Sequence, residues 1–128
     1  MDLEKQIEYW REGAVDEMEA AEGLFSLGKY RQALFFAHLS LEKMIKAHVA
    51  KKTKEVPPKI HNLGRLSEIA ELSPPEDIAR FLKRFDIYQI ETRYPGTFIT
   101  ELKKEKASAK LAEAKKVLEW IKNQFKAK

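Results

Sequence analysis

Apolar residues recur at intervals of three and four along almost the whole chain, and this spacing constrains the fold more than any other feature. Residues three or four apart lie on one face of an α-helix, so each such run predicts an amphipathic helix that buries one stripe. No segment of the sequence shows the apolar–polar alternation of a half-buried β-strand. The pattern therefore predicts an all-α protein. The first run comprises Leu3, Ile7, Trp10, Ala14, Met18, Ala21 and Phe25.

Glycine, proline and capping residues divide these runs into five expected helices. Gly28 is expected to end the first helix, because glycine adopts the left-handed conformation without a Cβ clash. Asn62 is expected to cap the third helix, and Ser73 with Glu76 has the spacing of a capping box for the fourth. The expected ranges are 3–27, 30–52, 63–72, 74–92 and a last helix that begins between residues 101 and 107.

The length of the chain sets its expected organisation. A chain of 128 residues can bury a core without disulfides or metal ions, and it fits a single domain over residues 1–128. Short connections leave consecutive helices antiparallel. We therefore expect an up-down antiparallel bundle of four to five helices.

Composition excludes several classes of protein. The absence of cysteine excludes disulfides, cysteine-based zinc sites and thiol nucleophiles. The three histidines lack the spacing of a metal motif and the five glycines form no phosphate-binding loop, so neither a metal nor a cofactor is expected. The acidic start is unlike a signal peptide and no apolar run could span a membrane, so we expect a cytoplasmic location.

Charge is distributed unevenly along the chain. Residues 1–28 carry eight acidic and two basic residues, a net charge of −6, whereas residues 29–61 carry eight basic and two acidic residues, a net charge of +6. Residues 101–128 add a further +5, from nine lysines against four glutamates. These basic segments favour an anionic partner, with solvated lysine faces as the alternative explanation.

The second helix carries a polar stripe within an otherwise apolar surface. Polar groups in such a surface need partners, since an unpaired buried group costs roughly 1–3 kcal/mol. Two interpretations stay open. Either His38 and Glu42 satisfy each other or bond a neighbouring helix, or the stripe lines a pocket between helices or between two copies of the chain. At about 100° per residue, the stripe comprises Arg31, Phe35, His38, Glu42 and Val49, with Lys46 just outside it.

Two further segments contain candidate binding residues. His61 and Asn62 precede a helix whose unpaired N–H groups could hold a phosphate, although such a pair is also a common helix cap. Arg93 and Tyr94 lead into Pro95-Gly96 and combine a fixed charge, an aromatic ring and a rigid turn. Ion pairing by Arg93 and packing of Tyr94 are the alternative explanation.

Three segments taken together resemble the HEPN family, the helical nucleotide-binding domains of higher eukaryotes and prokaryotes. They are residues 30–50, with Ala37-His38-Leu39 and Leu41-Glu42-Lys43, the connection over residues 57–63, and the turn over residues 92–95. The resemblance covers nearly the whole chain. It implies an up-down helical bundle, often a homodimer, that contacts nucleotides or RNA and is commonly encoded beside a minimal nucleotidyltransferase.

Some members of that family are metal-independent ribonucleases that act as toxins, with an Arg-x(4–6)-His motif in a late helix. The resemblance implies that the arginine neutralises phosphate and that the histidine transfers a proton. In this chain residues 89–91, Gln-Ile-Glu, occupy the positions after Arg84 where that histidine would lie. Arg31 and His38 have the permitted spacing, but on the second helix, and a ribonuclease of this type would use Arg31 or Arg93 with His38.

The sequence thus supports three hypotheses. The first is a nucleotide-binding or partner-binding module that acts with a minimal nucleotidyltransferase in a toxin–antitoxin-like pair. The second is a metal-independent ribonuclease, and the third is a purely structural dimerisation module. For the first, the expected binding residues are His38, Glu42, Lys43, Lys46, His61, Asn62, Arg93 and Tyr94.

Overall fold

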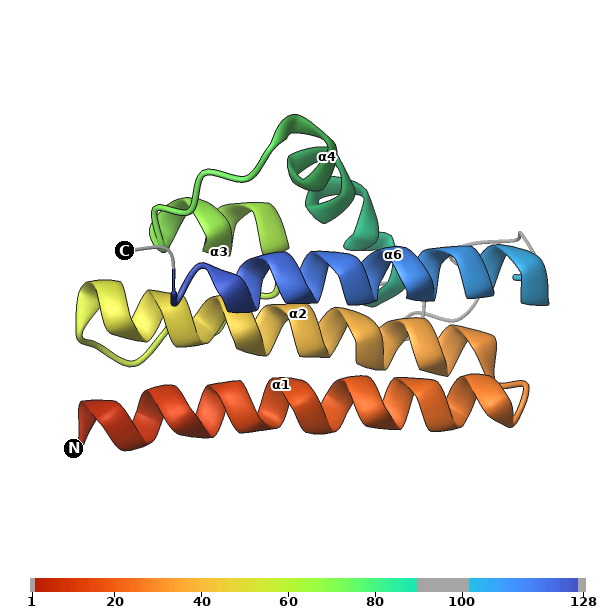
Figure 1. Cartoon of the computed structure of the whole chain (residues 1–128), viewed down its shortest axis with the longest axis horizontal. Coiled ribbons are helices and arrows are strands. Elements are labelled where there is room, and N and C mark those ends of the chain that lie inside the picture. The colour runs from red at the N-terminus through yellow and green to blue at the C-terminus, as the bar shows by residue number, and fades with distance from the viewer. Residues whose placement is uncertain (1, 90–101, 127–128) are drawn as a thin grey trace.

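The computed structural model describes residues 2–89 and 102–126 (Figure 1). In these two ranges the chain forms helices and no strand, which confirms the all-α class and the helical bundle predicted from the apolar spacing. None of the described helices is long and apolar enough to cross a membrane. The helices are α1 (Leu3–Ser26), α2 (Tyr30–Thr53), α3 (Leu63–Ile69), α4 (Glu76–Phe85) and α6 (Lys104–Asn123).

The helix α2 is the centre of the molecule. Figure 1 shows the three long helices side by side, with α2 between α1 and α6, antiparallel to α1 and parallel to α6, and with α3 and α4 above them in this view. Because α2 has neighbours on several sides, fourteen of its residues are buried, against three of α1 and six of α6. Polar side chains on α2 must therefore find their partners within the protein.

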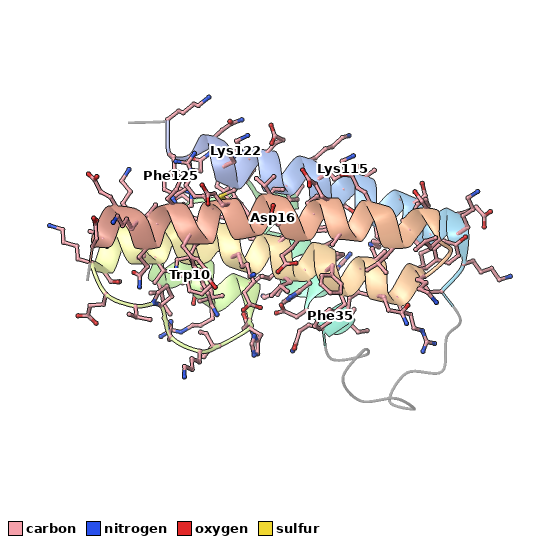
Figure 2. All side chains as sticks on the ribbon, turned by 90° about the horizontal axis from the view of Figure 1, so that it is seen from below. Trp10, Asp16, Phe35, Lys115, Lys122 and Phe125 are labelled. Carbon is pink, nitrogen blue, oxygen red and sulfur yellow. The ribbon has the colours of Figure 1, made fainter. Side chains whose placement is uncertain are left out.

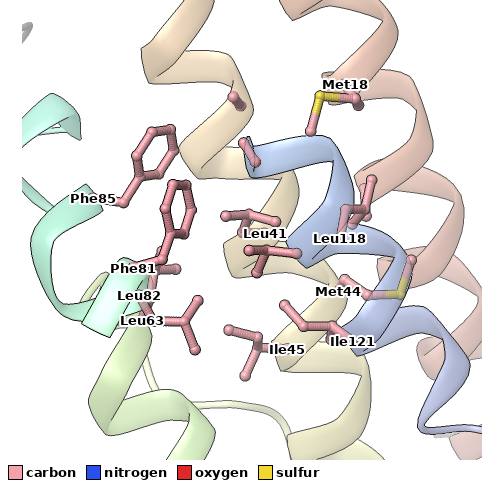
Figure 3. Close-up of a cluster of buried hydrophobic side chains, with 14 of the residues drawn as sticks. Met18, Leu41, Met44, Ile45, Leu63, Phe81, Leu82, Phe85, Leu118 and Ile121 are labelled. Carbon is pink, nitrogen blue, oxygen red and sulfur yellow. The ribbon is translucent and has the colours of Figure 1, made fainter. Parts of the chain in front are cut away.

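The apolar core joins α2 to α4 and α6 (Figure 3). Leu41 and Ile45 of α2, Phe85 of α4 and Ile121 of α6 are each at most 1% exposed. Burying one such side chain stabilises the fold by about 1.5–3 kcal/mol. Phe85 also stacks on Phe81, with ring centroids 4.7 Å apart. This packing fixes the end of α4 and so determines where the next residues of the chain can lie.

Several predicted helix boundaries are confirmed. Gly28 follows α1 with a φ of +77°, the left-handed conformation expected of a helix stop. Asn62 caps α3, since its side-chain oxygen accepts a hydrogen bond from the N–H of Arg65 at 2.8 Å. The bounds of α2 agree with the predicted range to within a residue, and α6 begins inside the predicted interval.

The predicted capping box at the start of α4 is wrong. Pro75 occupies the N-cap position and makes no side-chain hydrogen bond there, so Ser73 is not the cap. The consecutive prolines at residues 74 and 75 disfavour helical backbone at the residues before them, which delays the start of the helix. Glu76 and Asp77 instead place two carboxylates in the first turn, where they complement the helix dipole.

The prediction that the fourth helix continues without a break past Phe85 is also wrong. The helix ends at Phe85, Asp86 lies in a turn, and helical backbone resumes only at residues 87–89. Aspartate is a poor residue for a helix interior because its carboxylate competes for backbone N–H groups. Here that carboxylate bonds the N–H of Leu63 at 3.2 Å, outside its own helix. Thr92 lies outside the described residues.

Two glycines in different conformations test these boundaries. Gly23 lies inside α1, and a Cβ added there meets no atom within 4 Å. We expect Gly23→Ala to raise the free energy of unfolding by about 0.5–1 kcal/mol, because glycine is a poor helix former. We expect Gly28→Ala to lower it by about 1 kcal/mol, because alanine is strained at positive φ. Urea denaturation measures both, and effects of the same sign would contradict the left-handed turn.

Candidate functional site

The polar stripe of α2 meets the loop before α3 and the end of α4. His38, Glu42 and Lys46 lie on successive turns of α2, and all are buried. They connect to His61 in the loop and to Asp86 after α4. We call these five residues the α2 polar cluster. The cluster brings together three segments that are distant in the sequence.

Asp86 holds the inner end of the cluster. Because a carboxylate only accepts hydrogen bonds, His38 donates its Nε2–H to Asp86 Oδ1 at 2.8 Å. The same oxygen accepts the backbone N–H of Leu63, the first residue of α3, which has no partner within its own helix. The His38 ring also stacks against Phe85, with centroids 6.1 Å apart. One carboxylate therefore ties together α2, α3 and the end of α4.

Glu42 holds the outer end of the cluster. Its carboxylate accepts hydrogen bonds from Lys46 Nζ at 2.9 Å and from His61 Nδ1–H at 3.1 Å. The Lys46 ammonium also lies over the ring of Trp10, 5.5 Å from its centroid. Figure 2 shows Trp10 on the side of α1 where the loop between α2 and α3 runs. The outer end thus lies where α1, α2 and this loop meet.

The structure answers the question that the sequence left open about His38 and Glu42. His38 Nδ1 lies 3.9 Å from Glu42 Oε1, which is too far for a hydrogen bond. Each residue instead bonds a different segment, His38 the turn after α4 and Glu42 the loop before α3. The stripe therefore satisfies its buried polar groups through neighbouring elements.

Burial separates the interior of the cluster from an edge at the surface. His38 is 1% exposed, and the Glu42 and Lys46 side chains are 6% and 8% exposed. The His61 side chain is 44% exposed. Because its Nδ1–H is directed at Glu42, its Nε2 lies on the opposite side of the ring. A buried carboxylate that orients an exposed imidazole is suited to binding a polar ligand or to transferring a proton.

Two other predicted binding residues are engaged elsewhere. Lys43 points toward α1, where its Nζ donates to Glu17 at 2.7 Å and its side chain packs against Gly13. The Asn62 side chain is used to cap α3. Neither residue belongs to the α2 polar cluster, although Asn62 adjoins it in the chain.

The residues expected of a ribonuclease are not brought together in the described structure. Arg31 and His38 are seven residues apart, a rise of about 10 Å along the helix, and His38 is directed at Asp86. Arg93 and Tyr94 lie outside the described residues. Among residues 2–89 and 102–126, no group of three or more histidine, aspartate or glutamate side chains could hold a metal ion.

Sequence reasoning missed Asp86 and the role of Trp10. Asp86 stands between Phe85 and Ile87, and an isolated acid among apolar residues needs a partner, which was the available signal. Trp10 belongs to the apolar stripe of α1, and nothing local to its sequence marks it as the ring beneath a lysine of α2. Both roles depend on contacts between distant segments.

The model of the HEPN domain family matches residues 7–124 of the chain. The chain belongs to the HEPN family. Its structure is similar to that of TT1696 from Thermus thermophilus, with 26% identity, a TM-score of 0.78, and coverage of 92% of this chain and 97% of that one. It is also similar to ST0689, an archaeal HEPN homologue, with 24% identity, a TM-score of 0.72, and coverage of 93% and 97%. A search of curated proteins found no match.

Membership confirms the resemblance inferred from the second helix, the connection before the third helix and the late turn. The matched range contains all five residues of the α2 polar cluster, so the cluster is part of the HEPN domain itself. The likeness to the archaeal homologue supports the fold alone. The two solved structures thus agree with the family match on the helical architecture that positions the cluster.

Proposed function

We propose that this HEPN domain is a binding module for a nucleotide or RNA, and that it acts with a minimal nucleotidyltransferase in a toxin–antitoxin-like pair. The observation that carries the proposal is the outer end of the α2 polar cluster. There buried Glu42 orients the half-exposed imidazole of His61, and Lys46 binds the same carboxylate. A preorganised imidazole of this kind can bond phosphate, ribose or base edges without first losing much conformational freedom.

Further groups are expected to complete the binding site. Arg93 supplies a charge that can pair with phosphate in a bidentate manner, and Tyr94 supplies a ring for stacking. A homodimer, in which two copies of the domain present their clusters together, is part of the same proposal. The roles of Arg93 and Tyr94 and the homodimer are proposed from the sequence and from family membership.

The geometry favours binding over ribonuclease activity at His38. That histidine is 1% exposed, and its Nε2–H is committed to Asp86. It could reach a phosphodiester only if the cluster opened, which would leave Asp86 and the first N–H of α3 without their partner. His61 is accessible, but proton transfer to a substrate also needs a group that stabilises the developing charge, and Lys46 is already paired with Glu42.

Substitution of His61 tests the binding site. We expect the protein to bind ATP or a short single-stranded RNA with a micromolar dissociation constant, and His61→Ala to weaken that binding by about tenfold or more, since the oriented imidazole is lost. Isothermal titration calorimetry measures both affinities. Because the His61 side chain is 44% exposed, its removal should leave the thermal midpoint nearly unchanged.

The matched control is Arg65→Ala on α3. Arg65 is an exposed residue close to His61 in the sequence, and within the described part of the chain its side chain pairs with Glu68 at 3.4 Å. The Arg65→Ala variant should therefore bind ATP and RNA with unchanged affinity. The site would be refuted if the protein bound neither ATP nor RNA at about 1 mM, or if His61→Ala and Arg65→Ala weakened binding equally. Failure to co-purify with a co-expressed minimal nucleotidyltransferase would refute the partner.

A further inference from the structure

A groove lies between α4 and α6, which face each other in Figure 1. Two cavities of about 410 Å³ and 420 Å³ lie along it and share Asp77, Phe81 and Glu113 in their linings. They therefore form one continuous depression. Its walls come from α4, α6 and the residues that follow α4, and they include none of the five residues of the α2 polar cluster.

The groove is strongly basic. Against the carboxylates of Asp77 and Glu113, five cations line it, which leaves a formal charge of +3. One cation, Arg80, pairs with Glu76 at 2.9 Å. The other four make no ion pair within the described part of the chain, so their charge is available to a ligand. These four are Arg84, Lys106, Lys110 and Lys116.

The groove is also partly apolar, in a way that disfavours a nucleic acid. Ile78 and Val117 line one end, and Ile87, 37% exposed, lines the other. The aromatic rings in its walls are at most 8% exposed, so they offer no open face on which a base could stack. A phosphodiester backbone would match the cations but would leave these aliphatic surfaces uncovered.

We infer that this groove binds an acidic amphipathic helix of a protein partner. Along α6 the lining runs from Lys106 to Val117, a rise of about 16 Å, which is the length of about three helical turns. The apolar stripe of such a helix covers Ile78 and Ile87, while its carboxylates pair with Arg84 and Lys110. Recognition of an amphipathic helix in a groove rests on this combination of apolar anchors and flanking charges.

Binding of a designed peptide tests the inference. The probe is a fluorescent helical peptide of about 14 residues, with leucine at every third or fourth position and glutamate on both flanks of that stripe. We expect a micromolar dissociation constant in fluorescence anisotropy, and a loss of at least about tenfold in the variant Arg84→Glu/Lys110→Glu, because each changed residue repels the glutamates. Circular dichroism confirms that the variants are folded.

The matched control changes the same amount of charge elsewhere. Lys54→Glu/Lys59→Glu alters two exposed lysines of the loop after α2, neither of which lines the groove, and it should retain binding. A peptide with its leucines replaced by serine should bind at least about tenfold more weakly. Three results would overturn the inference: equal losses in both double variants, no peptide binding at about 100 µM, or a loss of RNA affinity in Arg84→Glu/Lys110→Glu as large as the loss of peptide affinity.

Discussion

Glu42→Ala should lower the free energy of unfolding by about 3–5 kcal/mol, the range expected when one partner of a buried ion pair is removed. The side chains of Glu42 and Lys46 are 6% and 8% exposed, and Lys46 Nζ lies 2.9 Å from Glu42 Oε2. The substitution therefore leaves an ammonium group buried without its carboxylate. His61 loses the acceptor of its Nδ1–H as well. Urea denaturation at neutral pH, followed by circular dichroism, measures the loss.

The chain contains a matched control for this prediction. Glu76 and Arg80 also form an i, i+4 pair at 2.9 Å, but their side chains are 83% and 56% exposed. Glu76→Ala should therefore cost no more than about 0.5 kcal/mol, as is usual for surface pairs. Similar losses in the two variants would show that Glu42 is not a buried charge. Adding Lys46→Met to Glu42→Ala should recover part of the stability, because it removes the unpaired ammonium.

Glu42→Gln separates the proposed binding function from a purely structural dimerisation module. Glutamine keeps an oxygen for Lys46 or His61 but removes the charge that both groups face. If the cluster only specifies the fold, this variant changes stability or oligomeric state and leaves ATP and RNA affinity unchanged. If the cluster orients His61 for a ligand, Glu42→Gln lowers the affinity for ATP and RNA, as His61→Ala does.

Asp86→Ala should lower the free energy of unfolding by about 3 kcal/mol, the second large effect that the structure predicts. The carboxylate oxygen Oδ1 accepts two hydrogen bonds, from His38 Nε2–H at 2.8 Å and from Leu63 N–H at 3.2 Å. His38 is 1% exposed, so its donor cannot turn to water. Hydrogen exchange should show lost protection in α3, whose first N–H is released, with α1 unaffected.

Two further variants define the origin of that effect. Asp86→Asn keeps an oxygen acceptor at the same place without the charge, and should cost about 1 kcal/mol. Asp77→Ala removes an exposed carboxylate from the first turn of α4 and should cost less than about 1 kcal/mol, through the helix dipole alone. If Asp86→Ala were no more destabilising than Asp77→Ala, the hydrogen bonds from Asp86 to α2 and α3 would not stabilise the fold.

The helical architecture could be predicted from local sequence signals. The three-four apolar spacing, the stop at Gly28 and the cap at Asn62 act over one or two turns, and the bounds of α2 follow from them closely. The predictions that were wrong concern α3, which ends at Ile69 and not at Leu72 because the chain turns at Glu71 with a φ of 56°, and the two ends of α4, at Pro75 and Asp86. At Asp86, where α4 ends, the carboxylate bonds distant segments that no local signal marks.

Periodicity on α2 was also sufficient to identify His38, Glu42 and Lys46 as polar groups that need partners. Which partners they have could not be read from that helix, because hydrogen bonds between elements depend on how the core places α3 and α4 against α2. Asp86 and His61 enter the cluster only through that packing, and they lie 48 and 19 residues away from the groups they bond. The same packing turns His38 inward and leaves His61 at the surface, which moves the candidate site from the middle of the stripe to its edge.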